Sequence, residues 1–342
     1  MVKKILVPLD GSALATCVLP HVVAIAQAMD AHITLLHVLE SHSVPAGAVN
    51  PVDWQLYKAE VQAYLNALGE QLSQCLTRLP SLQIVEGLVA EHIIGYAQKH
   101  DFDLLVLSSH GQGGLSSWNV SSVVQKVIHR AHKSFLLVRA YQPCAEYTKG
   151  DWGAFRYRRI LVLLDGSQRA EYALSVATAL AQHDEAQLLL AHVIARPAMI
   201  HRMPLTAEDS ALLDQITARN QALATQYLED LQAHLSPTPQ LYIQTHDNAA
   251  TALHRLVEQQ AVDLVILCAH GYSGQQQWPY GNVATSFITY GTTPLLVMQD
   301  LPQHEIPRSK AELIYEEMQR QPYSTHETFE TKWMNANKEI CA

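Results

Sequence analysis

The sequence predicts an α/β fold of two tandem doubly wound domains, each with a five-stranded parallel sheet flanked by helices. The chain has 342 residues, of which 48% are apolar, and this is enough to fill two buried cores of roughly 150 residues each. Its predicted strands are nearly continuous apolar runs, which indicates a sheet covered on both faces. Its two parts also repeat one another, which indicates a duplicated domain.

The repeat consists of three blocks that recur in the same order and at nearly the same offset. Chance is a poor explanation for three matched blocks in register, so we expect the two halves to fold alike. The paired blocks are ILVPLDGS (5–12) and ILVLLDGS (160–167), TLLHV (34–38) and LLAHV (189–193), and DLLVLSSHGQGG (103–114) and DLVILCAHGYSG (263–274).

Each half alternates short apolar runs with stretches of helical periodicity, which is typical of a parallel α/β sheet. Helical spacing is seen in Leu14, Val18, Val22 and Ala26, and in Leu65, Leu68, Leu72 and Leu76. The predicted strands are Ile5–Leu9, Ile33–Leu39, Gln83–Glu86, Leu104–Ser108 and Phe135–Arg139 in the first half, and Ile160–Leu164, Gln187–Val193, Leu241–Thr245, Leu264–Cys268 and Leu295–Gln299 in the second.

Changes in composition predict the domain boundaries. Residues 141–157 lack periodicity and are interpreted as a linker between a first domain at 1–140 and a second at 158–300. Residues 301–342 are polar and are predicted to form a loosely held C-terminal tail, in which Lys310–Gln319 is compatible with a helix.

Charge and cysteine content argue against several functional classes. The formal net charge is −9 and there is no block of lysine or arginine, whereas a nucleic-acid-binding protein normally has a basic face. No apolar run reaches the ~18 residues of a membrane-spanning helix. The apolar stretch near the N-terminus is broken by Pro8, Asp10 and Gly11, so it is too short for a signal peptide. Five scattered cysteines without a CxxC motif favour a reducing cytoplasm.

Polar, glycine-containing segments follow the first and fourth predicted strands, which are neighbours at the switch point of a doubly wound sheet. Asp10 follows the first strand, and His110 and Gly111 follow the fourth. Ligands bind at such switch points. The carboxylate can accept hydrogen bonds from sugar hydroxyls, and the glycine turn exposes amides to phosphate. A helix that opens near Ser121 and Ser122 directs its positive end to the same place.

The second half offers matching positions in the same order. Each segment alone is a weak signal, because the sequence has neither GxGxxG nor a P-loop here, and Asp-Gly-Ser is also a common helix cap. The prediction therefore depends on both segments occurring twice. The second-half residues are Asp165, His270, Gly271, Gly274, Gly281 and Asn282.

Catalysis and metal binding are not indicated by the sequence. No GxSxG motif is present, and the adjacent Ser109 and His110 are expected to point apart, so a triad with Asp10 is not expected. The 18 histidines include no HExxH motif, and His129 and His132 are interpreted as solvated or capping side chains. Slow ATP turnover stays open, although no activating base or arginine finger is evident.

The motifs resemble those of the universal stress protein family in its tandem form, through ILVPLDGS, LLHV, DLLVLSSHG and a serine-led helix. The resemblance covers about residues 2–140 and 158–300. It implies that each half has a parallel sheet of strand order 3-2-1-4-5. It also implies a stress-response role, in which binding of ATP or another adenine nucleotide, with or without Mg²⁺, switches partners or assembly.

Some members of that family bind ATP through the pattern Gly-x2-Gly-x9-Gly-Ser/Thr, which neither half matches fully. If the third position requires a positive φ, Gly281 adopts it freely, whereas Ser121 is strained by ~1–2 kcal/mol. This favours the second half slightly as the nucleotide site. The residues at the pattern positions are Ser108, Gly111, Ser121 and Ser122 in the first half and Cys268, Gly271, Gly281 and Asn282 in the second.

The resemblance places the adenine base against the ends of the first two strands of each half. These positions are also ordinary core positions, so a purely structural role stays open. The residues concerned are Pro8, Leu9 and Val38, and in the second half Leu164 and Val193. Four histidines at strand ends are expected to shape the pockets, namely His37, His110, His192 and His270.

The alternative is a protein-interaction module of the same fold without nucleotide. The resemblance implies pairing through the fifth strand, so Phe135–Arg139 and Leu295–Gln299 are expected to pair with each other or to mediate dimerisation. Pairing within the chain would make it a pseudo-dimer and satisfy an otherwise open sheet edge. The tail at 301–342 would then contact a partner.

Overall fold

The computed structural model describes residues 2–40, 51–114, 120–140, 151–196, 206–271 and 279–299. All of them belong to one compact unit, Met1–Asp300. The "first half" below means residues 2–140 and the "second half" residues 151–299. Gly274, residues 141–150 of the predicted linker, and the predicted tail with its Lys310–Gln319 segment lie outside the described residues.

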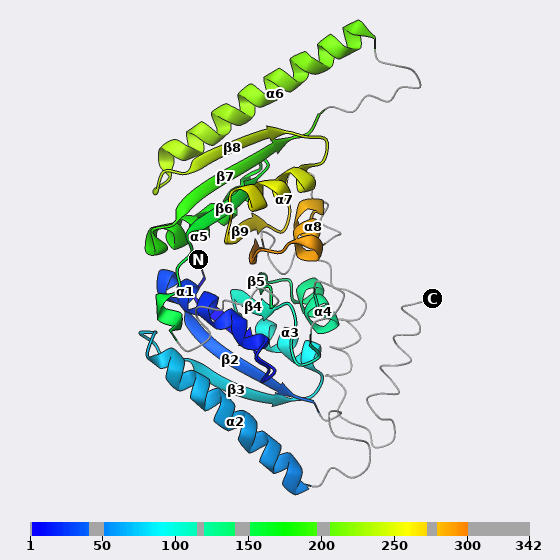
Figure 1. Cartoon of the computed structure of the whole chain (residues 1–342). Helices are drawn as coiled ribbons and strands as arrows, with labels where there is room; N and C mark the ends of the chain where they lie inside the picture. Colours follow the sequence, from blue (N-terminus) through cyan, green and yellow to red (C-terminus); the bar gives the residue numbers. More distant parts are fainter. Residues whose placement is uncertain are drawn as a thin grey trace, which may run out of the picture. The chain divides into compact units, whose positions relative to one another are not determined.

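The two halves contribute to one ten-stranded sheet (Figure 1). Its strand order is β3-β2-β1-β4-β5-β10-β9-β6-β7-β8, so each half has the predicted order 3-2-1-4-5 and the fold class is confirmed. Each predicted strand overlaps an observed one. The strands are β1 Lys4–Pro8, β2 His32–Leu39, β3 Ser81–Glu86, β4 Leu104–Ser108, β5 Ser134–Val138, β6 Arg159–Leu164, β7 Gln187–Ile194, β8 Gln240–Thr245, β9 Leu264–Cys268 and β10 Leu295–Met298.

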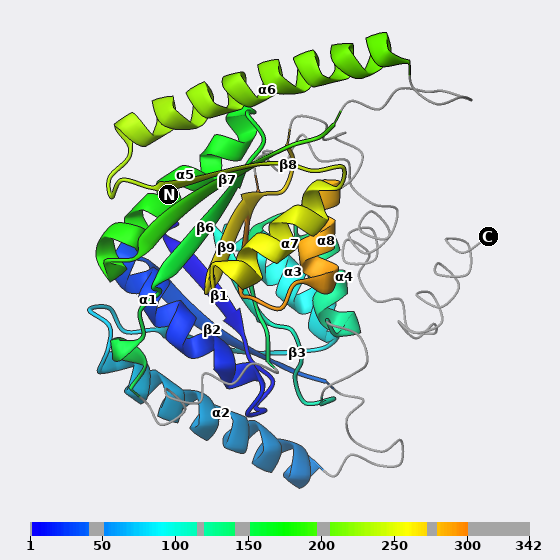
Figure 2. The ribbon, with the colours of Figure 1, turned by 45° about the horizontal axis from the view of Figure 1, so that its top comes forward.

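The helices cover both faces of the sheet, as the apolar strands predicted. They are η1 Ala15–Val18, α1 Leu19–Met29, α2 Pro51–Ser73, α3 Val89–Lys99, α4 Ser122–Ala131, η2 Trp152–Ala154, α5 Gln168–Asp184, α6 Ala207–His234, α7 Ala249–Gln259 and α8 Asn282–Tyr290. In β1, Ile5 and Val7 join the core beneath α1, α2, α5 and α6, whereas Leu6 joins the core beneath α3, α4, α7 and α8. Figures 1 and 2 show the latter four helices grouped on one side of the sheet. None of the described helices is long and apolar enough to span a membrane.

The central strands β5 and β10 join the two halves. They are antiparallel, whereas the neighbouring strands within each half are parallel. The pairing predicted between the fifth strands is thus present within the chain, and β3 and β8 are left at the edges of the sheet. The register aligns Phe135 with Val297, Leu136 with Leu296, and Leu137 with Leu295.

Each half also caps a helix of the other. Arg139 follows β5 and is fully buried, and its Nη2 donates to the carbonyls of Phe287 (2.8 Å) and Ile288 (3.1 Å) in α8. Tyr280 precedes α8, and its hydroxyl donates to the Ile128 carbonyl in α4 at 2.7 Å. Because Ile128 and Ile288 are at equivalent positions near the ends of equivalent helices, both bonds satisfy carbonyls that a helix leaves open at its C-terminus.

The described end of the predicted linker packs on the core. Trp152, Phe155 and Tyr157 are buried, and the Tyr157 hydroxyl lies 2.8 Å from His21 Nδ1 in α1. Burial lowers the pKa of His21 to about 3. The segment lacks periodicity because its backbone is irregular, yet its aromatic side chains anchor it to the first half.

Candidate functional site

The two polar segments of the first half meet at the carboxyl edge of the sheet. Asp10, after β1, accepts the Ser12 amide on Oδ1 at 2.9 Å. Its Oδ2 accepts the Gln112 amide at 2.5 Å, across 102 residues of sequence. Asp10 therefore ties the loop that follows β4 to the end of β1, at the switch point where ligands bind in doubly wound sheets.

Glycine is required where each loop crosses its aspartate. A Cβ at Gly111 would overlap the Asp10 carboxylate, and a Cβ at Gly271 would overlap the carboxylate of Asp165. The two halves therefore share one close contact between a carboxylate and a glycine backbone. This steric requirement is the reason that these two residue types recur together.

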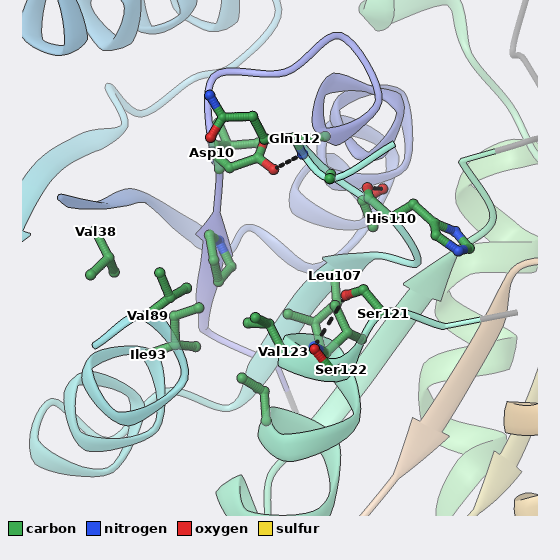
Figure 3. A pocket seen from close by; sticks show the side chains of 18 of the residues that line it. Asp10, Val38, Val89, Ile93, Leu107, His110, Gln112, Ser121, Ser122 and Val123 are labelled. Atoms are coloured by element: carbon green, nitrogen blue, oxygen red, sulfur yellow. Dashed lines mark hydrogen bonds between the residues drawn. The ribbon is translucent and has the colours of Figure 1, made fainter. Parts of the chain in front are cut away.

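A cavity of about 720 Å³ opens beside this contact in the first half, a size typical of small-molecule sites. Figure 3 shows its apolar wall, formed by Val38 of β2, Val89 and Ile93 of α3, Leu107 of β4 and Val123 of α4. All predicted first-half residues line it, namely Pro8, Leu9, Asp10, Val38, His110, Gly111, Ser121 and Ser122.

The second half has a matching cavity of about 780 Å³. Leu253 of α7 and Val283 of α8 form part of its apolar wall, at positions equivalent to those of Ile93 and Val123. The residues predicted from the sequence therefore line the cavity of each half, while their role in binding stays a prediction. The predicted second-half residues that line this cavity are Leu164, Asp165, Val193, His270, Gly271, Gly281 and Asn282.

The helix N-terminus beside the first cavity is capped by a side chain. Ser121 is the N-cap of α4, and its hydroxyl accepts the Val124 amide at 3.4 Å. The amides of Ser122 and Val123 have no hydrogen-bond partner among the described residues. The first cavity therefore presents these two amides to an approaching anion.

The helix N-terminus beside the second cavity is more open. Gly281 is the N-cap of α8 and provides no side-chain cap. The amides of Asn282, Val283 and Ala284 have no hydrogen-bond partner within the described part of the chain. The second cavity therefore presents three open amides, one more than the first.

The third position of the family pattern does not need a positive φ, so the condition under which the second half was favoured is wrong. Ser121 has φ −67° and Gly281 has φ −70°, and both adopt the extended conformation that any residue tolerates. Ser121 is therefore unstrained. The halves differ here in the presence of a capping hydroxyl, and not in backbone strain.

The side chains that replace the first glycine of the family pattern are bonded to the protein. Ser108 Oγ lies 2.7 Å from the His110 carbonyl and 3.1 Å from the Leu14 carbonyl. Cys268 Sγ donates to the Ala170 carbonyl at 3.6 Å. Both residues line their cavities, so they add bulk there, while their polar atoms are bonded to backbone carbonyls.

Ser109 and His110 do not point apart as expected. Ser109 Oγ lies 3.0 Å from His110 Nδ1 and accepts the Ala140 amide at 3.0 Å. Ser109 is fully buried, and Figure 3 shows the His110 ring turned away from Asp10. The contact therefore stabilises the strand end and does not form a triad with the aspartate.

Two further histidines lie behind the aspartates. His37 alternates with Leu36 and Val38, which line the first cavity, so its side chain is on the opposite face of the sheet. Burial lowers the pKa of His37, and the nearby Asp10 raises it to a smaller extent. His192 repeats this arrangement beside Asp165. Neither His37 nor His192 is among the residues that line the cavities.

Two features of the site escaped the sequence analysis. His129, on α4 of the first half, lines the second cavity. Glu91 of α3 and Arg130 of α4 form a largely buried bidentate ion pair with distances of 2.6 and 2.8 Å. No spacing in the sequence links residues on different helices. His132 is the C-cap residue of α4 and has a left-handed backbone conformation.

The described residues offer no metal site of their own. No group of three or more histidine, cysteine, aspartate or glutamate side chains among them could hold a metal ion. Lysine and arginine are also missing from the described lining of both cavities.

Several known proteins are similar to the chain in sequence or in structure. The chain is 29% identical over 140 residues to the universal stress protein MJ0531 of Methanocaldococcus jannaschii, covering 40% of this chain and 82% of that protein. A universal stress protein structure from Archaeoglobus fulgidus superposes with a TM-score of 0.58 at 15% identity, covering 87% of this chain and 98% of the other. A universal stress protein solved in complex with cAMP covers 41% of this chain and 98% of its own, at 18% identity and a TM-score of 0.33.

The sequence profile of the universal stress protein family matches the chain twice, at residues 1–139 and 156–299. The two matches correspond to the two halves of the sheet and together cover most of the chain. The chain is therefore a tandem member of the universal stress protein family.

Proposed function

We propose that the chain is a regulatory protein of the stress response whose cavities bind ATP or another adenine nucleotide. The observation that carries the proposal is the duplicated mouth, in which a carboxylate, a glycine backbone and an open helix N-terminus converge beside an apolar cavity. Binding would then change the partners or the assembly of the protein, which we place in the cytoplasm.

The lining of the first cavity suggests how a nucleotide would be oriented. Val38, Val89 and Ile93 offer an apolar wall for the base. Each Asp10 oxygen accepts one amide and keeps a lone pair for a ribose hydroxyl. The open amides at the start of α4 would receive phosphate oxygens.

The phosphates would be bound without help from lysine or arginine side chains, because the described lining of both cavities contains neither residue. The described residues also fail to form a metal site, so any Mg²⁺ would be held by the nucleotide's own phosphates. We therefore expect ATP affinity to rise when Mg²⁺ is present, because the cation offsets phosphate charge near Asp10 and Asp165.

The alternative of a nucleotide-free interaction module has less support. Its sheet-edge contact is already used inside the chain by β5 and β10. Its other element, the tail, lies outside the described residues. We therefore keep it as the outcome that an empty pair of cavities would favour.

The proposal is tested by mass spectrometry of freshly purified protein that has been denatured to release any bound nucleotide. We expect an adenine nucleotide to be released from the wild type. Replacing Asp165 by Ala together with Gly271 by Val should abolish retention if the second cavity is the tighter site. Unchanged retention would assign the site to Asp10 and Gly111. A wild type that retains nothing, and binds no added ATP, would contradict the proposal.

A further inference from the structure

The second cavity contains a residue that belongs to the first half. His129 lies in the last turn of α4, and the first turn of that helix lines the first cavity. His129 itself lines the second cavity. The equivalent residue of α8, Thr289, is not among the described residues that line the first cavity. The second site is therefore completed across the domain boundary, whereas the described lining of the first comes from the first half alone.

Tyr280 fixes the position of His129 relative to the second cavity. Its hydroxyl donates to the Ile128 carbonyl, one residue before His129. Its ring lies edge-on to Phe135 of β5, at 5.7 Å, and 6.1 Å from the His129 ring. Tyr280 directly precedes Gly281, the N-cap of α8. His129 therefore lies toward the end of the cavity where the three open amides begin.

We propose that the second cavity is a composite anion site, in which His129 of the first half joins the α8 amides in binding the phosphates of the nucleotide. The inference rests on the proposed nucleotide binding and names the side chain that would contact phosphate. Among the described lining residues, His270 is also a histidine, but it is buried. His129 is exposed at the rim, where an imidazole N–H can reach a ligand oxygen.

A bound phosphate would change the charge state of His129. In the free protein, partial burial and, to a smaller extent, the neighbouring His132 lower its pKa. A phosphate brought close by the α8 amides would raise that pKa and favour the protonated ring. The strongest interaction would therefore form with the charged end of the ligand and not with its base.

The test uses a full-length chain in which Val38→Trp fills the first cavity, so that only the second can bind. ATP and adenosine are titrated in parallel by calorimetry. We expect His129→Ala to weaken ATP binding about 5- to 10-fold, the loss of one charge-assisted hydrogen bond, and to leave adenosine unchanged. His129→Lys should restore most of the ATP affinity. Thr289→Ala is the matched control and should change neither ligand.

The possible failures separate the two proposals. If the Val38→Trp protein binds neither ATP nor adenosine, nucleotide binding in the second cavity fails, and the inference fails with it. If ATP binds there with the same affinity after His129→Ala, only the inference is overturned. Equal weakening of ATP and adenosine would also overturn it, because His129 would then shape the cavity wall and not bind phosphate.

Discussion

The two cavities have the same aspartate–glycine contact and differ at the helix N-termini, where phosphate would lie. Asp10 packs on Gly111 in the first half, and Asp165 packs on Gly271 in the second, in the same close contact. The N-caps of the adjacent helices differ, since Ser121 supplies a capping hydroxyl and no side chain does so before α8. The aspartate–glycine contact, which steric exclusion enforces, is therefore the same in both halves. The helix N-cap, where either residue is tolerated, differs.

The helices behind the cavities differ in the same way. In the first half, the Glu91–Arg130 ion pair fastens α3 to α4. The residue of α8 equivalent to Arg130 is Tyr290, which is 70% exposed. The first cavity therefore has a helix pair that is fixed by charge, whereas in the second half His254 of α7 contacts α8, with its Nε2 3.2 Å from Ser286 Oγ and its ring stacked on Phe287.

The largest predicted difference between the halves concerns this ion pair. We expect Arg130→Ala to lower the free energy of unfolding by about 3 kcal/mol, because it leaves the buried Glu91 carboxylate without its partner. Tyr290→Ala, at the equivalent exposed position, should change it by no more than ~0.5 kcal/mol. Urea denaturation measures both. Equal losses would show that the ion pair does not distinguish the halves.

The strands, their order and the meeting of the aspartates with the glycine loops could all be predicted from the sequence. Buried parallel strands are continuous apolar runs, and a duplicated pattern repeats the evidence. The predicted boundaries are close to those observed, although the helix expected from Leu14 begins as η1 and becomes α1 at Leu19. The strands depend on local sequence, whereas their order was expected from the resemblance to the universal stress protein family.

Other parts of the site depend on packing that no local pattern encodes. His129 reaches the second cavity only because β5 and β10 pair and bring α4 beside Tyr280. The positive φ considered for Gly281 was suggested by its being glycine, but an N-cap residue is extended, and Gly281 follows that rule. The apolar wall formed by Val89 and Ile93 could not be predicted either, because it depends on how α3 crosses the sheet.

The buried contact between His21 and Tyr157 of the linker predicts a pH effect. The unfolded chain protonates His21 below its ordinary pKa of 6.5, whereas the folded chain does so only near 3. The free energy of unfolding should therefore fall as the pH falls from 6.5 toward 3, by ~1.4 kcal/mol per pH unit from this residue. His21→Gln should remove that part of the slope in urea titrations. Parallel pH profiles for the two proteins would contradict the assignment.

The smallest predicted effect concerns the two caps. Ser121→Gly should free the Val124 amide and tighten ATP binding in the first cavity about 3- to 10-fold, and Gly281→Ser should weaken the second cavity by a similar factor. Neither exchange strains the backbone, since φ is −67° and −70° at these positions. Calorimetric titration of each variant measures the change. Opposite signs, or no change in either variant, would show that the cap does not set phosphate affinity.

The most direct test of the central claim is an ATP titration of the wild type beside two matched variants, Val38→Trp and Val193→Trp. Both substitutions fill a cavity from the same half-buried strand position. We predict that the wild type binds ATP at two sites, that Val193→Trp removes the tighter one, and that Val38→Trp removes the weaker one. A wild type without saturable ATP binding, or variants that bind exactly as much ATP as the wild type, would contradict the account.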